Sequence, residues 1–265
     1  MIKFNPRNYS GILVVFSLFL IWLFLSESGM VGKTLIATPS EVLDVVTSAF
    51  MDDAKKSEKF HVHTIATIKR ALTGWFVAGV FGILIGVIIG SVYRLYTSTE
   101  IVSEFIRAIP PILAFPLLLV AFNYGEQAYI WTIIFGCFPV MLLTVAKGVA
   151  DVPQSRIDVL KVFDVEASVA SFVKAMEIMP SVFLGARLTL TISITIAVVA
   201  EMVFTPRNGL SLGSLARDSQ IDFNTSMFYT CVIAIGLFGY LANLLLRKME
   251  ERFDPLADNL STIRK

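Results

Sequence analysis

The sequence predicts an all-α membrane protein with about six transmembrane helices, and two observations carry this prediction. Apolar residues make up 55% of the 265 residues and charged residues only 16%, whereas an ordinary soluble domain has about 25% charged residues. The apolar residues also form runs of roughly 20, the length that spans a bilayer as a helix. Six spans leave no room for a soluble catalytic domain, and a net charge of +1 argues against a nucleic-acid-binding surface.

The first apolar run, 11–25, follows a short tail that carries Lys3 and Arg7. The residues after it match a small-x-small cleavage site poorly, so we expect a retained helix within 1–30 rather than a signal peptide. An extracytoplasmic amphipathic segment is expected at 31–70. Within it, Ser40 is predicted to cap a short interfacial helix, and the charged stretch 55–59 is predicted to be solvated.

The other five spans are predicted at 72–92, 101–122, 128–149, 181–204 and 227–246. They form a core, 71–250, which includes a cytoplasmic loop at 150–180, and a cytoplasmic tail follows at 251–265. Six spans place both termini on one side of the membrane, and more of the basic residues lie inside when the N-terminus is cytoplasmic. We therefore expect a multi-pass protein of the plasma (inner) membrane. Apolar and polar residues alternate over 188–196, as in a strand of an outer-membrane β-barrel. The other spans are continuous apolar runs of helical length, so we expect a helix here as well.

Small residues recur at every fourth position of the second span. This spacing places them on one helix face, where they let a second helix approach closely. We expect this face to be a helix-packing surface, formed by Gly74, Ala78, Gly82, Gly86 and Gly90.

The fifth span carries a parallel series at the same spacing, and its members are more polar. The hydroxyls can bond back to their own helix, which favours packing, or they can line a path for a polar solute. The series ends on an acid that needs either an interface position or a partner, for which Arg187 and the outer loop are candidates. The series consists of Gly185, Thr189, Ser193, Ala197 and Glu201.

Four prolines fall in the third and fourth spans: Pro110, Pro111, Pro116 and Pro139. Each deprives the carbonyl four residues earlier of its donor, and such carbonyls must face protein or a water-filled cavity. We expect kinked helices here, in a protein that changes shape or as static kinks. Pro110 and Pro111 are therefore further candidates for lining a path.

The cytoplasmic loop 150–180 has apolar residues at helical spacing. This pattern predicts a pair of amphipathic helices under the membrane. They would form either a docking surface or a structural hairpin without a partner.

At this point the sequence resembles the membrane permeases of ATP-binding-cassette (ABC) importers, in the branch that handles nitrate, sulfonates and taurine. The resemblance covers most of the chain and rests on the order of several short motifs. These are Pro-Ser-Glu-Val-Leu from Pro39, Ile-Pro-Pro from Ile109, Phe-Pro-Leu from Phe115, Met179-Pro180, Gly-Ala-Arg-Leu from Gly185, and Ala-Glu-Met from Ala200 ahead of Asn-Gly-Leu at Asn208.

The resemblance implies a type I permease fold that dimerises around a central path. It also implies separate ABC ATPase subunits, a second permease subunit in a homo- or heterodimer, an extracytoplasmic solute-binding protein and a small anionic solute. It implies no enzymatic activity and no cofactor in this chain.

In this family, a Glu-Ala-Ala sequence and a glycine in the cytoplasmic loop dock into the ATPase. Counting back from Pro180 places Lys161-Val162-Phe163 at the Glu-Ala-Ala positions and Ala167 at the glycine. A one-residue gap instead aligns Val165-Glu166-Ala167-Ser168 with the family's Leu-Gly-Ala-Ser. The ATPase-coupling residues implied are Val159, Leu160, Lys161, Val162, Phe163, Asp164, Val165, Glu166, Ala167 and Ser168. Either alignment departs from the family pattern, so pairing with a more typical permease subunit is one interpretation.

Other chemistry is not supported. Gly32-Lys33-Thr34 lacks the preceding glycine of a phosphate-binding loop. His61 and His63 point apart on a helix and are expected in a solvated outer loop, and Cys137 and Cys231 are expected to pack as small hydrophobes rather than in a disulfide or a metal site. A secondary transporter or channel, and a non-transporting scaffold subunit, remain the alternatives.

Overall fold

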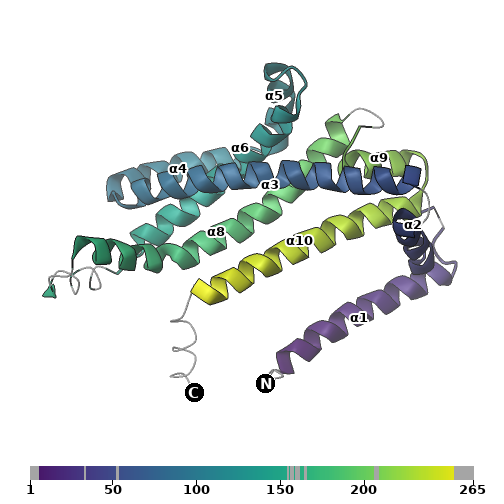
Figure 1. Cartoon of the computed structure of the whole chain (residues 1–265), viewed down its shortest axis with the longest axis horizontal. Coiled ribbons are helices and arrows are strands. Elements are labelled where there is room, and N and C mark those ends of the chain that lie inside the picture. The colour runs from purple at the N-terminus through teal and green to yellow at the C-terminus, as the bar shows by residue number, and fades with distance from the viewer. Residues whose placement is uncertain are drawn as a thin grey trace.

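The computed structural model describes residues 6–32, 34–51, 54–153, 155, 158, 162–163, 166–205 and 209–253. Every regular element in these ranges is a helix, which confirms the predicted fold class. The elements are α1 (Pro6–Glu27), α2 (Pro39–Met51), α3 (Ala54–Gly90), α4 (Tyr93–Ala108), the 3₁₀ helix η1 (Pro111–Ala114), α5 (Phe115–Ala121), α6 (Glu126–Ala150), α8 (Ala167–Phe204), α9 (Leu212–Ile221) and α10 (Thr225–Phe253). In Figure 1, α2 and α9 lie at one end of the bundle and the start of α8 lies at the other.

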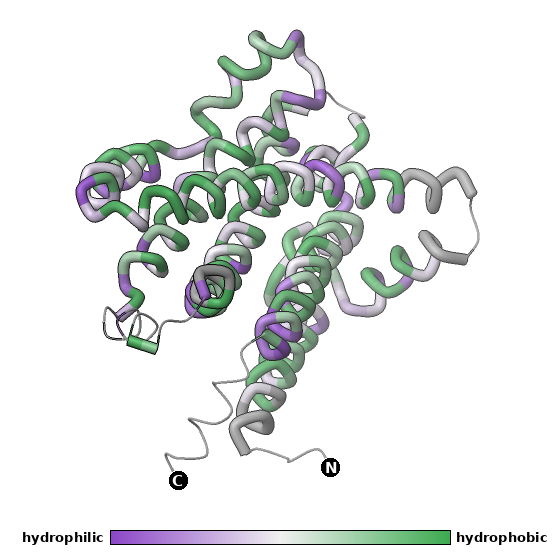
Figure 2. The backbone as a smooth tube through the Cα atoms, turned by 60° about the vertical axis from the view of Figure 1, so that its left-hand side comes forward, coloured by the Kyte–Doolittle hydropathy of each residue, from purple (hydrophilic) through white to green (hydrophobic). Residues whose placement is uncertain are grey.

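Among the described residues, four helices are long and apolar enough to cross a membrane, or five if the bent pair α4–α5 counts as one span. The four are Phe60–Gly90, Glu126–Ala150, Phe172–Phe204 and Thr225–Phe253. They correspond to the predicted second, fourth, fifth and sixth spans. The first predicted span lies in α1, in which Leu13–Glu27 forms a shorter apolar stretch. Large apolar side chains are exposed along these helices, such as Phe16, Phe76, Ile88 and Leu245. Figure 2 shows apolar residues along most of the tube, as expected for a surface that faces lipid.

The predicted third span, 101–122, is not one continuous helix, and the bend that was expected at its prolines is a complete break. In its place α4 ends at Ala108, and η1 and α5 continue at an angle of 77°. Ile109 has extended backbone angles, φ −79° and ψ 118°, because a residue that precedes proline is disfavoured in the helical region. Two consecutive prolines therefore end the helix, whereas the single Pro139 is accommodated within α6.

Most of the first half of the predicted helix pair in the cytoplasmic loop lies outside the described residues. The second half is the beginning of α8, which starts at Ala167 and passes Pro180 without ending, so it is continuous with the fifth span. A proline is tolerated inside a membrane helix where neighbouring groups satisfy the freed backbone. The amphipathic pattern before Pro180 therefore belongs to a long helix that extends beyond the apolar span.

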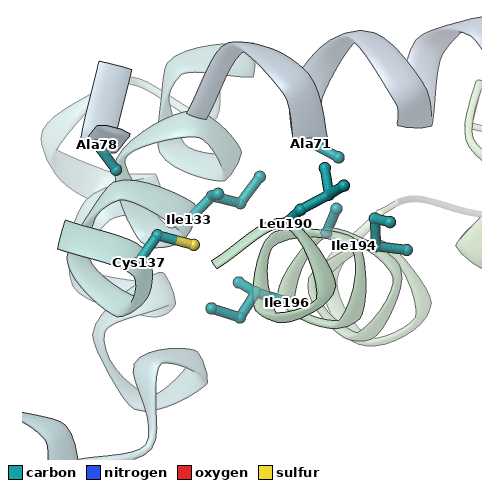
Figure 3. Close-up of a cluster of buried hydrophobic side chains, with 8 residues drawn as sticks. Ala71, Ala78, Ile133, Cys137, Leu190, Ile194 and Ile196 are labelled. Carbon is teal, nitrogen blue, oxygen red and sulfur yellow. The ribbon is translucent and has the colours of Figure 1, made fainter. Parts of the chain in front are cut away.

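The buried core joins α3, α6 and α8 (Figure 3). It contains Ala71, Ala78, Ile133, Cys137, Leu190, Ile194, Ile196 and Ala197. Cys137 and Cys231 are free thiols with no exposed surface. This confirms the expectation that the cysteines pack as small hydrophobes.

The predicted interfacial helix is α2, but Ser40 is not its cap. Thr38 precedes Pro39, and its Oγ1 accepts a hydrogen bond from the Glu41 backbone N–H at 3.3 Å. The Glu41 carboxylate accepts in return from the Thr38 N–H at 3.0 Å, which completes a capping box. Ser40 lies inside the first turn, one residue after the proline that occupies the first helical position.

We expect Thr38→Ala to destabilise α2 by about 1 kcal/mol, since it removes one of the two reciprocal cap bonds. Hydrogen exchange of the α2 amides should accelerate about fivefold. Thr47→Ala is the matched control, because it removes an exposed threonine hydroxyl from a later turn of α2 that makes no contact with the cap. Equal exchange in the two variants would contradict the assignment of Thr38 as the cap.

The α1–α2 connection is attached to the beginning of α10. The Trp22 indole stacks on Tyr229 with ring centroids 6.0 Å apart and donates to the Ala37 carbonyl at 3.0 Å. Tyr229 donates to the Leu35 carbonyl at 3.3 Å, and Thr225 donates to the Thr34 carbonyl at 3.0 Å. These bonds hold the end of α1 next to the α9–α10 end of the bundle.

Candidate functional site

Glu201 is fully buried near the end of α8 and accepts three hydrogen bonds. Arg70 Nη1 donates to its Oε1 at 2.7 Å. Its Oε2 accepts from Thr67 Oγ1 at 2.7 Å and from the Gly213 N–H at 3.2 Å. A buried carboxylate is tolerated when it is paired with a cation and also hydrogen-bonded, and this one is both.

The predicted pairing of Glu201 with Arg187 is wrong. Arg187 lies 14 residues before Glu201 on the same helix, or about 21 Å along the helix axis. It pairs instead with Glu250 of α10 at 3.0 Å. The outer-loop partner is confirmed, since Gly213 follows the segment that connects α8 to α9. Glu201 does not reach the lipid interface, because its side chain has no exposed surface.

Arg70 holds a second carboxylate with the other edge of its guanidinium. Its Nε and Nη2 donate to the two oxygens of Glu126, at 2.6 and 2.5 Å. The Tyr129 ring lies against the guanidinium, 4.7 Å from ring centroid to Cζ, in a cation–π arrangement. One side chain on α3 therefore connects the first turn of α6 to the end of α8.

The two carboxylates differ sharply in their surroundings. The Glu201 side chain is 0% exposed, whereas the Glu126 side chain is 66% exposed and has Arg70 as its hydrogen-bonding partner. The network therefore has a buried arm and an exposed arm that meet on one guanidinium. We call Arg70, Glu126 and Glu201 the ion triad.

The buried arm also anchors α9. The Leu212 N–H donates to Thr67 Oγ1 at 2.8 Å, and His63 Nδ1 lies 2.9 Å from the Ser211 nitrogen and 2.7 Å from its carbonyl oxygen. Ser211 caps α9 by accepting from the Ser214 N–H at 3.0 Å. The predicted solvated position of His63 is therefore wrong: α3 begins at Ala54, so His63 lies on a helix whose face it shares with Thr67, while His61 remains exposed.

The end of α8 is tied to α6 and α9 as well. Arg217 donates to the carbonyl oxygens of Met202 and Thr205, at 3.2 and 2.5 Å, which satisfies acceptors that the helix end leaves open. The hydroxyls of Tyr129 and Thr205 lie 2.8 Å apart. Four helices, α3, α6, α8 and α9, are thus joined at one end of the bundle.

Of the other path candidates, Thr189 and Ser193 are enclosed. Both are fully buried, and each bonds back to its own helix, to the carbonyls of Gly185 (2.7 Å) and Leu190 (2.8 Å). This geometry favours the packing interpretation over a path in this conformation. Pro110 is exposed and Pro111 is half-buried at the bend.

The small-residue face of α3 lies against α6. A Cβ built on Gly74 would be 2.6 Å from a methyl of Ile133, one on Gly82 would be 2.8 Å from Met141, and one on Gly86 would be 2.9 Å from the Leu142 carbonyl oxygen. Gly90 lies against Ala146, and Ala78 is fully buried in the core. The two helices approach closely along most of this face.

The structure describes part of the segment that is predicted to couple to an ATPase, 159–168. Val162 and Phe163 are 81% and 75% exposed. Glu166 precedes α8, and Ala167 and Ser168 begin that helix. The predicted coupling residues Val159, Leu160, Lys161, Asp164 and Val165 lie outside the described residues.

A cavity of about 600 Å³ opens between α4, α6 and α8 at the end of the bundle that holds this loop. Both acidic and basic side chains line it, among them Glu104, Arg107, Lys147 and Glu177. Within the described ranges, no group of three or more His, Cys, Asp or Glu side chains is arranged to hold a metal ion.

Sequence reasoning missed Arg70, Thr67, Glu126 and His63 as members of the network. One signal was available, because Arg70 and Glu126 lie at the ends of apolar runs, where an ionisable side chain requires a partner. That rule indicates that partners exist without identifying them.

Comparison with known proteins places the chain in a family. Residues 80–255, more than half of the chain, match the model of the binding-protein-dependent transport system inner membrane component. The nitrate import permease protein NrtB of Leptolyngbya laminosa is 24% identical over 266 residues, covering 95% of this chain and 94% of NrtB. The bicarbonate transport system permease protein CmpB of Synechococcus elongatus is 26% identical and covers 89% of this chain and 87% of CmpB. The taurine transport system permease protein TauC of Escherichia coli is 23% identical and covers 89% of this chain and 85% of TauC.

The fold is similar to a solved structure as well. A chain of the MetNI methionine ABC transporter in an inward-facing conformation matches with a TM-score of 0.56 and 20% identity, covering 70% of this chain and 94% of that one. Together with the helical architecture, the family match shows a multi-pass inner-membrane subunit that is not itself an enzyme, since the ATPase activity of such systems lies on a partner subunit. The chain belongs to the inner-membrane permease family of binding-protein-dependent ABC importers.

Proposed function

We propose that this chain forms the translocation path for a small oxyanion in an ATP-driven importer, with ATPase subunits on the cytoplasmic side and a solute-binding protein on the outer side. The observation that carries the proposal is the family match over residues 80–255. The relatives are described as transporting nitrate, bicarbonate, taurine and aliphatic sulfonates. These solutes share a compact, negatively charged group of oxygen atoms, which is the substrate class that we assign.

The contact with the ATPase is assigned to residues 159–168. Val162 and Phe163, in the segment between α6 and α8, are largely exposed. The start of α8, which follows this segment, lies at the end of the bundle opposite α9 (Figure 1). Exposed large apolar side chains in a polar connecting segment are typical of a surface that a partner covers. This assignment places the N- and C-termini in the cytoplasm and α9 on the outer side.

The proposal includes a second permease subunit, identical or homologous. The bent α4–α5 pair exposes Phe105, Leu113 and Leu117 around its 77° break. An apolar groove of about 470 Å³ lies next to them, lined in part by Trp131 and Phe135 of α6. We assign this surface to the contact between the two permease subunits.

Substituting the exposed aromatic of the loop tests the coupling. We expect Phe163→Lys to reduce both the amount of ATPase that co-purifies and the rate of solute uptake by at least about tenfold, since a charge replaces an apolar contact at a docking surface. Phe163→Leu is the matched control and should retain most of both. Uptake is measured in proteoliposomes that contain the whole complex, with nitrate, bicarbonate and taurine as probes.

Two results would contradict the proposal. If no ATPase subunit co-purifies with the unmodified chain and uptake proceeds without ATP, the chain is a secondary transporter or channel. If the ATPase co-purifies and uptake is unaffected by Phe163→Lys, residues 159–168 do not form the coupling contact.

A further inference from the structure

The exposed arm of the ion triad joins the first turn of α6 to α3. Glu126 belongs to the first turn of α6, directly after the α5–α6 connection. Glu201, Thr67 and Gly213 belong to α8, α3 and the start of α9, which are held together by buried hydrogen bonds. The bond between Glu126 and Arg70 therefore attaches the α5–α6 connection to a rigid body formed by α3, α8 and α9.

The α5–α6 connection has an unusual backbone. Asn123 and Tyr124 both have positive φ angles, 49° and 58°. Two consecutive residues other than glycine rarely adopt this conformation, and it is sterically costly for a side chain as large as tyrosine. Such a conformation persists when surrounding contacts maintain it. Within the turn, the Tyr124 N–H donates to the Leu119 carbonyl at 2.7 Å. The bond from Arg70 to Glu126, two residues beyond Tyr124, adds a contact from outside the turn.

The surface beneath this connection is an apolar cluster. Phe115, Ala128 and Tyr129 from α5 and α6 pack against Ala200 and Phe204 of α8. The Phe115 and Phe204 rings stack with centroids 4.5 Å apart, and Ala128 is fully buried. Movement of the α5–α6 connection away from α8 would expose Ala128.

The two arms of Arg70 differ in how easily they can break. Water can replace Arg70 at the Glu126 carboxylate, because 66% of that side chain is already exposed. The Glu201 carboxylate is enclosed by protein, and its separation from Arg70 would leave a buried charge without a cation. Glu201 keeps the guanidinium in place when Glu126 leaves.

We propose that Glu126 and Arg70 form a latch that opens and closes the α5–α6 connection against α8 and α9 during the transport cycle, with Glu126 as the moving positioning residue and Glu201 as the fixed anchor. The latch controls access to the apolar cluster at the outer end of the bundle. Its place in the cycle rests on the proposed importer function, whereas its existence as a breakable contact does not.

A thiol introduced by Ala128→Cys tests the latch. The complex that contains the full chain with this substitution is labelled with a maleimide in lipid nanodiscs, and labelled sites are identified by peptide mass spectrometry. Cys137 and Cys231 are fully buried and serve as internal references. We expect Glu126→Gln to raise the labelling rate at position 128 about two- to fivefold, because labelling follows the population of the open form and an exposed ion pair is worth little more than this factor.

Glu251→Gln is the matched control. The Glu251 side chain is 60% exposed, close to the 66% of Glu126, and it pairs with Arg247 at 2.9 Å, so this variant neutralises a similarly exposed carboxylate whose ion pair lies within α10 alone. Its labelling rate at position 128 should equal that of the chain that carries Ala128→Cys alone. An increase in both variants, or in neither, overturns the latch.

A second readout separates a working latch from a static contact. In the complex that carries Ala128→Cys alone, labelling at position 128 should differ at least about twofold between the nucleotide-free form and the form with a non-hydrolysable ATP analogue. Glu126→Gln should remove most of this difference. Equal rates with and without nucleotide would show that the ion pair is only structural. If no ATPase is present in the complex, the importer function itself fails, and the comparison of Glu126→Gln with Glu251→Gln still decides whether the contact opens.

Discussion

Replacement of Arg70 by methionine should lower the free energy of unfolding by about 3–5 kcal/mol, the cost of leaving a buried carboxylate without its cation. Methionine retains much of the volume of the arginine stem, so the loss reports the ion triad more than packing. Thr67 and Gly213 still donate to Glu201 in this variant, but neither carries a compensating charge. Unfolding by titration with a denaturing detergent in mixed micelles measures the difference.

A second substitution in the same background identifies the cause. Arg70→Met/Glu201→Gln should recover at least half of the loss, because an uncharged amide replaces the buried carboxylate and can still accept from Thr67 or Gly213. Arg70→Met/Glu126→Gln should recover nothing, since the exposed Glu126 carboxylate is solvated without Arg70. Equal recovery in the two double variants would mean that the loss does not arise from the buried charge.

For the ion triad, the sequence predicted that Glu201 needs a partner but did not identify the partner. The cost of an acid in an apolar span is a local property, so Glu201 could be identified as a residue that needs a partner. The identity of the partner is not local. Arg70 lies 131 positions earlier in the chain, and its approach to Glu201 depends on how α3 packs against α8. The one cation on the same span, Arg187, was the available candidate, and helix geometry places it too far away.

The break in the third span could be predicted only in part. The prolines that cause it were visible, and their effect on backbone hydrogen bonds was expected. Whether a proline kinks a membrane helix or ends it depends on the conformation of the residue before it and on neighbouring groups that satisfy the freed backbone, and those neighbours are set by tertiary structure. Pro139 and Pro180 remain within helices, whereas Pro110 and Pro111 end one.

The spacing of small residues in the second span was a better guide to the structure than the prolines or Glu201, because helix periodicity is a local property of the sequence. It predicted a face for close helix contact, and in the structure that face lies against α6. The sequence pattern could not name α6, since a face of this kind accepts any helix that presents a complementary surface. The same limit applies to Thr189 and Ser193, whose polarity allowed either packing or a path until their burial was known.

Substitutions at two glycines of α3, Gly86 and Gly79, test how much the close contact between α3 and α6 contributes to stability. A Cβ on Gly86 would lie 2.9 Å from the Leu142 carbonyl oxygen and 3.0 Å from the Val145 Cβ, whereas a Cβ on Gly79 would meet nothing within 4 Å. The Leu142 oxygen is backbone and cannot rotate away, so a side chain at position 86 must push α6 from α3. Both positions lie inside the same helix, so Gly86→Leu and Gly79→Leu gain the same helix propensity.

The difference in unfolding free energy between Gly86→Leu and Gly79→Leu therefore isolates the helix contact. We expect Gly86→Leu to be less stable by about 1–3 kcal/mol or more, the usual cost of overpacking a close interface. Gly79→Leu should match or slightly exceed the unmodified chain, because its side chain extends into open space. Denaturing-detergent titration of the two variants gives the difference directly. Equal stabilities would mean that α6 can withdraw from α3 without loss, and that the small residues from Gly74 to Gly90 do not maintain this packing.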